Sequence, residues 1–154
     1  MNSKKLLSDC FQAERELLGS HLLVQAKLSG SALRLRKEMF TSATHAQIYD
    51  VMVSMQEEDV TCDMLILYNE LSKRSVNVSL NSILDLTSKS ISVVSNSDYY
   101  VNIIVDCFEK LQARRILEDS IHQDAPLDYI RENVDVLNNV IANVRTSKTY
   151  KFLL

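Results

Sequence analysis

The sequence predicts an all-α protein, in which a small globular helical head is followed by a long antiparallel helical hairpin. The 154 residues include only two glycines and one proline, so residues that interrupt helices are scarce. The last third of the chain repeats its apolar residues every three or four positions, which is typical of helices that pack along other helices. A chain of this length can bury one hydrophobic core, because about 68–70% of its unfolded surface is lost on folding.

The head, residues 1–96, is expected to begin with two helices. Asp9 is the predicted N-cap of the first, which continues to Val24 and in which Gly19 leaves room for a close neighbour. The second is expected at 26–39. It carries the main basic cluster of the head, which we interpret as a solvated helix face or, alternatively, as a contact for phosphate or an acidic partner. This basic cluster consists of Arg34, Arg36 and Lys37.

Three more helices complete the predicted head. Ser42 or Thr44 is expected to cap the third, which ends at the acidic run 57–59. Asp63 suits the cap or the first turn of the fourth, and the apolar residues of 80–86 predict the fifth.

A serine-rich connection, 88–97, follows the head helices. Its apolar residues resemble a short strand, but the sequence offers no partner strand, so we expect a connection whose valines pack against the core. The apolar residues are Ile91, Val93 and Val94.

The hairpin is predicted at 97–145, with its turn at 124–126 and a linker or tail at 146–154. The second hairpin helix has a heptad seam that is expected to hold the hairpin shut. The seam residues are Leu127, Ile130, Val134, Leu137, Ile141 and Val144. The first hairpin helix is apolar on more than one side, so a second surface must cover it, either the head or another copy. We expect self-association or partner docking through Tyr100, Ile104, Phe108, Leu111, Arg114 and Arg115.

The sequence lacks the patterns that carry chemistry. It has no GxxxxGK[ST] phosphate loop, and two glycines cannot build a GxGxxG loop. The three histidines lie in separate segments, and the three cysteines are far apart, which predicts reduced thiols and no metal site. We therefore expect no catalytic residue, no cofactor and no enzyme activity of this chain alone. A formal net charge of −3 predicts weak or no direct binding to nucleic acid. No long apolar run suggests a signal or membrane span, so a cytoplasmic protein is expected.

Four stretches, in order, resemble the N-terminal domain of the DnaB-type replicative helicases of bacteria and their phages. They are AERELLGSHLL, EMFTSATHAQIYDVMVSM, TCDMLILYNEL and SVVSNSDYYVNIIVDCFEKLQARRIL. The residues that carry the resemblance are Glu14, Leu17, Leu18, Gly19, Leu22, Phe40, His45, Ile48, Tyr49, Met52, Asp63, Leu67, Leu71, Tyr100, Ile104, Val105, Arg114 and Arg115. The chain departs from the family at SKRSVNVSLNS, where a glycine-rich bend is usual, and at its end, where the family continues into a RecA-like ATPase domain.

The resemblance implies an assembly and docking role in DNA replication. Domains of this family form an N-terminal collar on a hexameric helicase ring, and their hairpins bind primase or a helicase loader. One alternative is a stand-alone phage or mobile-element protein that mimics the collar and modulates the host helicase, loader or primase. Another is an unrelated small DNA-binding protein that uses the basic cluster.

Overall fold

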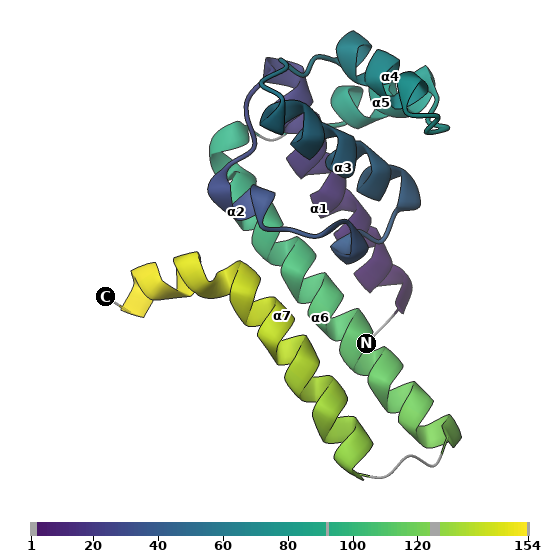
Figure 1. Ribbon diagram of the computed structural model, residues 1–154, viewed down its shortest axis with the longest axis vertical. Helices are drawn as coiled ribbons and strands as arrows, with labels where there is room; N and C mark the ends of the chain where they lie inside the picture. The colour runs from purple at the N-terminus through teal and green to yellow at the C-terminus, as the bar shows by residue number, and fades with distance from the viewer. Residues whose placement is uncertain (1–2, 92, 124–126, 154) are drawn as a thin grey trace.

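The structure, a computed structural model, describes residues 3–91, 93–123 and 127–153. These residues form helices and no strand, so the predicted all-α fold is confirmed. Figure 1 shows α1 to α5 gathered beside the first half of α6, while α7 returns along its second half. The predicted hairpin turn, 124–126, lies outside the described residues. In order, the elements are α1 (Ser3–Val24), α2 (Gly30–Leu33), η1 (Lys37–Met39), α3 (Ala43–Glu57), α4 (Met64–Lys73), α5 (Leu80–Ser88), η2 (Val94–Asn96), α6 (Ser97–Gln123) and α7 (Leu127–Leu153).

Helix α1 lies at the centre of the head and contacts α3, α5 and α6. Between Ala13 and Leu22 every residue is buried except Arg15, which is half-buried. A helix covered on several sides must place its polar residues against partners, and α1 buries two carboxylates, those of Glu14 and Glu16. The position of α1 explains why its sequence is not simply amphipathic.

Side-chain oxygens begin several head helices. The Ser42 hydroxyl accepts a hydrogen bond from His45 N, and the Asp63 carboxylate accepts one from Ile66 N. These interactions satisfy amide groups that have no partner within the first turn of a helix. Asp63 is confirmed as a cap, and Ser42, rather than Thr44, caps α3.

The single helix expected at 26–39 is wrong, because this segment forms α2 and η1 instead. Side chains of α3 form hydrogen bonds with backbone groups that would otherwise bond to each other within a continuous helix. The Tyr49 hydroxyl lies 2.6 Å from the carbonyl oxygen of Ala32 and 2.9 Å from that of Leu35. Gln56 accepts a hydrogen bond from Leu28 N and donates one to Leu28 O. Tertiary hydrogen bonds thus override the local helical pattern.

Two other boundaries also differ from the prediction. Helix α1 begins at Ser3, with Asp9 inside it, because Leu6 and Cys10 are buried against α6 and extend the helix backwards. The connection before α6 packs down only in part, because Val94 is half-buried but Ile91 is 90% exposed and Val93 is 60% exposed.

Gly19 lies where α1 and α5 approach most closely, as its position predicted. A Cβ atom there would lie 2.9 Å from the Cβ of Ser90 and closer still to the carbonyl oxygen of Leu86. Any side chain at this position would push α5 away from α1, so glycine sets the spacing of the two helices.

Three head helices end on a residue with a left-handed backbone that is not glycine. Gln25, Asp59 and Ser75 have φ values of 55°, 58° and 57°. The following amide closes each end: Ala26 N bonds to His21 O, Val60 N to Met55 O and Val76 N to Leu71 O. This is the hydrogen bond of the Schellman motif. The segment SKRSVNVSLNS therefore makes its turn with Ser75.

Candidate functional site

The face of α6 that turns toward the head is part of the main core. Val101, Ile104 and Val105 are buried there, and Ile104 is 0% exposed. Helix α1 therefore supplies the second surface that the apolar sequence of α6 requires. In this fold Ile104 is out of reach of a partner protein.

The other predicted docking residues lie at different depths along α6. Tyr100 and Phe108 are half-buried against the main core, and Leu111 packs beside a small second cluster of Leu6, Cys10 and Cys107. Arg114 is half-buried and Arg115 is exposed. Their docking role stays a prediction.

The predicted seam residues of α7 fall into two groups. Toward the head end, Ile141 is buried and Leu137 packs against the core. Toward the turn, Ile130 is half-buried, whereas Leu127 is 59% exposed and Val134 is 39% exposed. The side chain of Val144 lies outside the described residues. The α6–α7 contact within one chain thus leaves apolar surface uncovered near the turn.

Several large apolar side chains near the hairpin turn are exposed, and we call them the distal hairpin surface. Leu117 and Ile121 are one helical turn apart on α6, while Tyr129 and Val136 are seven residues apart on α7, so each pair shares a helix face. On α7, Leu127 and Val134 share one face, and Tyr129 and Val136 share the opposite face, so the exposed apolar residues lie on both sides of the hairpin. Exposed apolar surface is the kind that protein partners cover, which makes these residues the candidate docking site. The distal hairpin surface consists of Leu117, Ile121, Leu127, Tyr129, Val134 and Val136.

The basic cluster of the head is exposed to solvent. Arg34 follows α2, Arg36 precedes η1 and Lys37 begins η1, and all three are exposed. None of the three is held in a described hydrogen bond or ion pair through its side chain. This arrangement fits a solvated surface.

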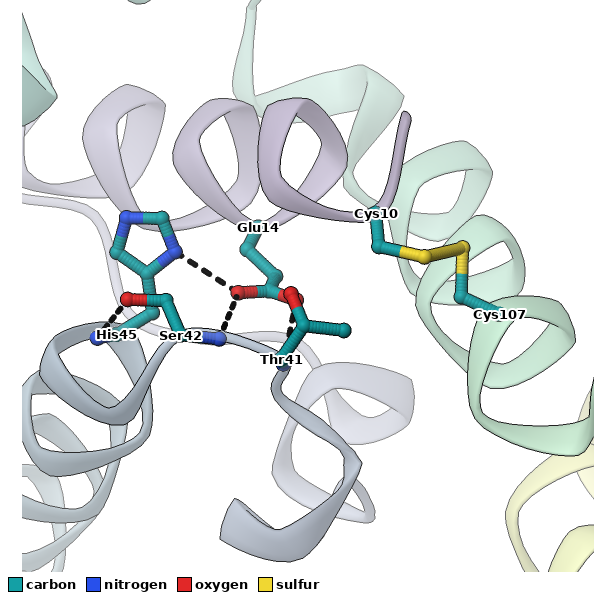
Figure 2. Close-up of a disulfide and its surroundings, with 6 residues drawn as sticks. All are labelled: Cys10, Glu14, Thr41, Ser42, His45 and Cys107. Carbon is teal, nitrogen blue, oxygen red and sulfur yellow. Dashed lines mark hydrogen bonds and ion pairs between the residues drawn. A yellow bond between two sulfur atoms is a disulfide. The ribbon is translucent and has the colours of Figure 1, made fainter. Parts of the chain in front are cut away.

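Glu14 is the centre of a buried polar cluster that joins α1 to the start of α3 (Figure 2). Its carboxylate accepts hydrogen bonds from Thr41 N at 2.8 Å, Thr41 Oγ1 at 2.7 Å and Ser42 N at 3.3 Å. It also lies 2.8 Å from His45 Nδ1. With both carboxylate oxygens engaged and the side chain 1% exposed, Glu14 holds the α3 cap in place.

Glu16 makes a matching attachment two residues later. Its carboxylate accepts hydrogen bonds from Ser90 Oγ and Ile91 N, both at 3.0 Å, and Arg15 lies 3.9 Å away. The two glutamates thus fasten opposite ends of the α3–α5 segment to α1. Glu14 was named from the sequence only among the residues of the family resemblance, and periodicity alone revealed neither buried contact.

The expectation of three reduced cysteines is wrong, because Cys10 on α1 and Cys107 on α6 form a disulfide (Figure 2). Their separation of 97 residues hid this pairing, which depends on α1 lying along α6. Cys62 is the free cysteine of the chain. Burial, assisted by the neighbouring Asp63 carboxylate, raises the pKa of the Cys62 thiol to about 12, which argues against a nucleophilic thiolate.

His21 makes stability depend on pH. Burial lowers its pKa below 6.5, partly opposed by the hydrogen bond from Nδ1 to Leu17 O. As the pH falls through 6.5, the unfolded chain therefore takes up this proton before the folded chain does. We expect the free energy of unfolding to fall with acidity there, by at most about 1.4 kcal/mol per pH unit from this group.

Urea unfolding at about pH 7.5 and about pH 5.5 measures this effect in the wild type and in His21→Gln. The wild type should lose more stability than the variant between the two conditions. Equal losses would contradict the assignment.

Residues 3–91, 93–123 and 127–153 contain no group of three or more histidine, cysteine or acidic side chains placed to hold a metal ion. Across the same ranges, no helix has both the length and the apolar character that a membrane span requires.

Comparison with known proteins identifies the fold. A sequence model described as the DnaB-like helicase N terminal domain matches residues 7–106. The chain belongs to this family. No curated protein matches it. A solved structure, the crystal structure of the N-terminal domain of DnaB helicase from Mycobacterium tuberculosis, is 22% identical in sequence, with a TM-score of 0.59. The alignment covers 86% of this chain and 95% of that one.

The sequence model covers the head and the first part of α6. The buried contacts of Glu14, the Asp63 cap and the Gly19 approach all fall within residues 7–106, whereas the distal hairpin surface lies beyond them. The similar structure supports the all-α fold of this DnaB-like domain. The matched family is a helicase N-terminal domain and not an ATPase domain.

Proposed function

We propose that this DnaB-like domain is a non-catalytic assembly and docking module of a replicative helicase. In this role it forms part of the N-terminal collar of the ring and binds primase or a helicase loader. The observation that carries the proposal is the distal hairpin surface, whose apolar side chains are exposed. It lies where α6 and α7 extend past the head (Figure 1).

The distribution of burial supports protein docking over chemistry. Three groups of the head that could act as acids or bases, Glu14, Glu16 and His45, are instead buried in hydrogen bonds within the chain. The sequence contains no phosphate loop that could bind a nucleotide for hydrolysis. Among its exposed residues the hairpin carries several large apolar side chains. Burying apolar surface against another protein stabilises a complex by roughly 25 cal/mol per Å² before the costs of association.

Self-association offers a direct test of this surface. We expect the wild-type domain to dimerise or form larger oligomers, and Ile121→Glu to weaken association by tenfold or more, because a carboxylate would be buried without a partner. Ile121 is 78% exposed in the single chain, so its replacement should leave the fold unchanged. Light scattering across a concentration series, with circular dichroism as a check on folding, measures both properties.

Asn138→Glu is the matched control, since Asn138 is an exposed polar residue of the same hairpin. It should associate like the wild type. A wild type that remains strictly monomeric at high micromolar concentration, or an Ile121→Glu variant that associates normally, would rule out this surface as the self-pairing site.

A further inference from the structure

The Cys10–Cys107 disulfide lies in a small cluster of its own, apart from the main core. Cys10 is 0% exposed and Cys107 is 4% exposed. They are packed with Leu6, and the half-buried Ile103 and Leu111 of α6 close the cluster. Figure 2 shows the bond running from the side of α1 across to α6. The disulfide thus joins the central helix of the head to the helix that carries the hairpin.

The first turns of α1 bury few side chains, and those they bury belong to this cluster. Between residues 4 and 12, Leu6 and Cys10 are buried and all other side chains are exposed. From Ala13 onward, in contrast, α1 is held on several sides and by the buried contacts of Glu14 and Glu16. Cleavage of the disulfide would remove the covalent link between these turns and α6 and would leave Leu6 and the two thiols as the buried side chains of the cluster.

We propose that Cys10 and Cys107 form a reversible thiol–disulfide exchange site, through which small thiols and disulfides control how firmly the first turns of α1 are fastened to α6. The site would react with low-molecular-weight thiols of the glutathione class and with their disulfides. Opening is local, because the segment that covers the sulfurs is the end of a helix with few buried side chains.

The exchange balances without any further reagent. A small thiolate attacks one protein sulfur, breaks the Cys10–Cys107 bond and forms a mixed disulfide, while the other cysteine leaves as a thiolate and takes up a proton. A second small thiol then attacks the mixed disulfide. The products are two protein thiols and one small-molecule disulfide, so the protein gains two electrons and two protons, and two small thiols lose them. Oxidised glutathione reverses each step.

The fold favours re-formation of the bond. The two Cα atoms are 5.9 Å apart, within the usual range for a disulfide, so the packing of α1 on α6 brings the reduced thiols back together. Cys62 does not compete, because it lies in a separate place and its thiol is held protonated by burial. Reduction is therefore expected to loosen one segment and to leave the rest of the head folded.

Two measurements on the full chain test the proposal. The protein is equilibrated with oxidised or with reduced glutathione, unfolded in acid, and alkylated so that free thiols can be counted by mass. We expect one free thiol after oxidation and three after reduction. Hydrogen exchange in residues 4–12 should be at least about tenfold faster in the reduced protein, whereas exchange in α3 should change little. The melting temperature should fall by roughly 8–15 °C on reduction.

The comparison uses one sequence in two redox states, so it does not depend on a variant that folds. Cys62→Ser serves as the matched control and should keep the full redox response, whereas Cys10→Ser should exchange like the reduced wild type in both buffers. The proposal is overturned if three thiols remain free after treatment with oxidised glutathione. It is equally overturned if residues 4–12 exchange at the same rate in both redox states.

Discussion

Glu14→Ala is expected to lower the free energy of unfolding by about 3–5 kcal/mol. The substitution removes the acceptor shared by Thr41, Ser42 and His45. In the variant, these donors would point into a small cavity instead of at a carboxylate. Buried donors without partners lose their hydration with no compensation. The start of α3 should loosen with them, because Ser42 is its cap. Urea unfolding followed by circular dichroism measures the loss.

Glu57→Ala is the control for Glu14→Ala, since Glu57 is exposed at the end of α3. Its effect should stay within about 0.5 kcal/mol. Glu14→Gln should lose an intermediate amount of stability, because its amide keeps one acceptor oxygen but points N–H groups at the other donors. If alanine at Glu14 cost no more than alanine at Glu57, the buried cluster would have no role in stability.

Ile104→Glu is expected to prevent stable folding, with a loss of more than about 4 kcal/mol. Ile104 is 0% exposed and belongs to the hydrophobic core between α6 and the head. A loss of this size approaches the total stability of many domains, which is about 5–15 kcal/mol. Circular dichroism and thermal melting would show a chain that is largely unfolded at room temperature.

An isoleucine-to-glutamate substitution near the other end of α6 is the control. Ile121→Glu should melt like the wild type, because Ile121 is 78% exposed. The two variants thus separate a residue that holds the fold from a residue that is available to a partner. If Ile104→Glu folded normally and lost only self-association, Ile104 would belong to a docking surface after all.

Features set by neighbouring residues were predictable from the sequence. Asp63 was identified as a cap because capping needs only a short polar side chain just before an apolar repeat. The apolar repeats of 97–145 predicted two long helices, since a period near 3.6 is a property of each helix alone. Gly19 could be assigned to a close approach because little else explains a glycine inside a helix.

Features set by distant residues were not predictable. The break between α2 and η1 is imposed by Tyr49 and Gln56 of α3, whose hydroxyl and amide groups gave no local sign of their targets. The disulfide required α1 to lie along α6, and no spacing rule connects residues 97 positions apart. Ile91 and Val93 were expected to be covered, but the Glu16 carboxylate fixes the backbone at Ile91 and leaves these side chains outside.

The sequence predicted that the hairpin would have an apolar surface to cover, but not which of its residues would remain exposed. The excess of apolar residues on α6 correctly indicated a second covering surface, but sequence alone could not divide that surface between the head and a partner. The head covers Ile104, whereas Leu117 and Ile121 remain exposed. The position of α1 decides which part of α6 is covered by the head and which part is left exposed.

The left-handed helix ends at Gln25, Asp59 and Ser75 mean that this fold can be made more stable than its present sequence makes it. A side chain in that backbone conformation costs roughly 1–2 kcal/mol relative to glycine. The head tolerates this cost three times, so its sequence lies several kcal/mol below the optimum for its own backbone. A protein engineer who wanted a more robust domain would start at these three positions, all of them outside α6 and α7.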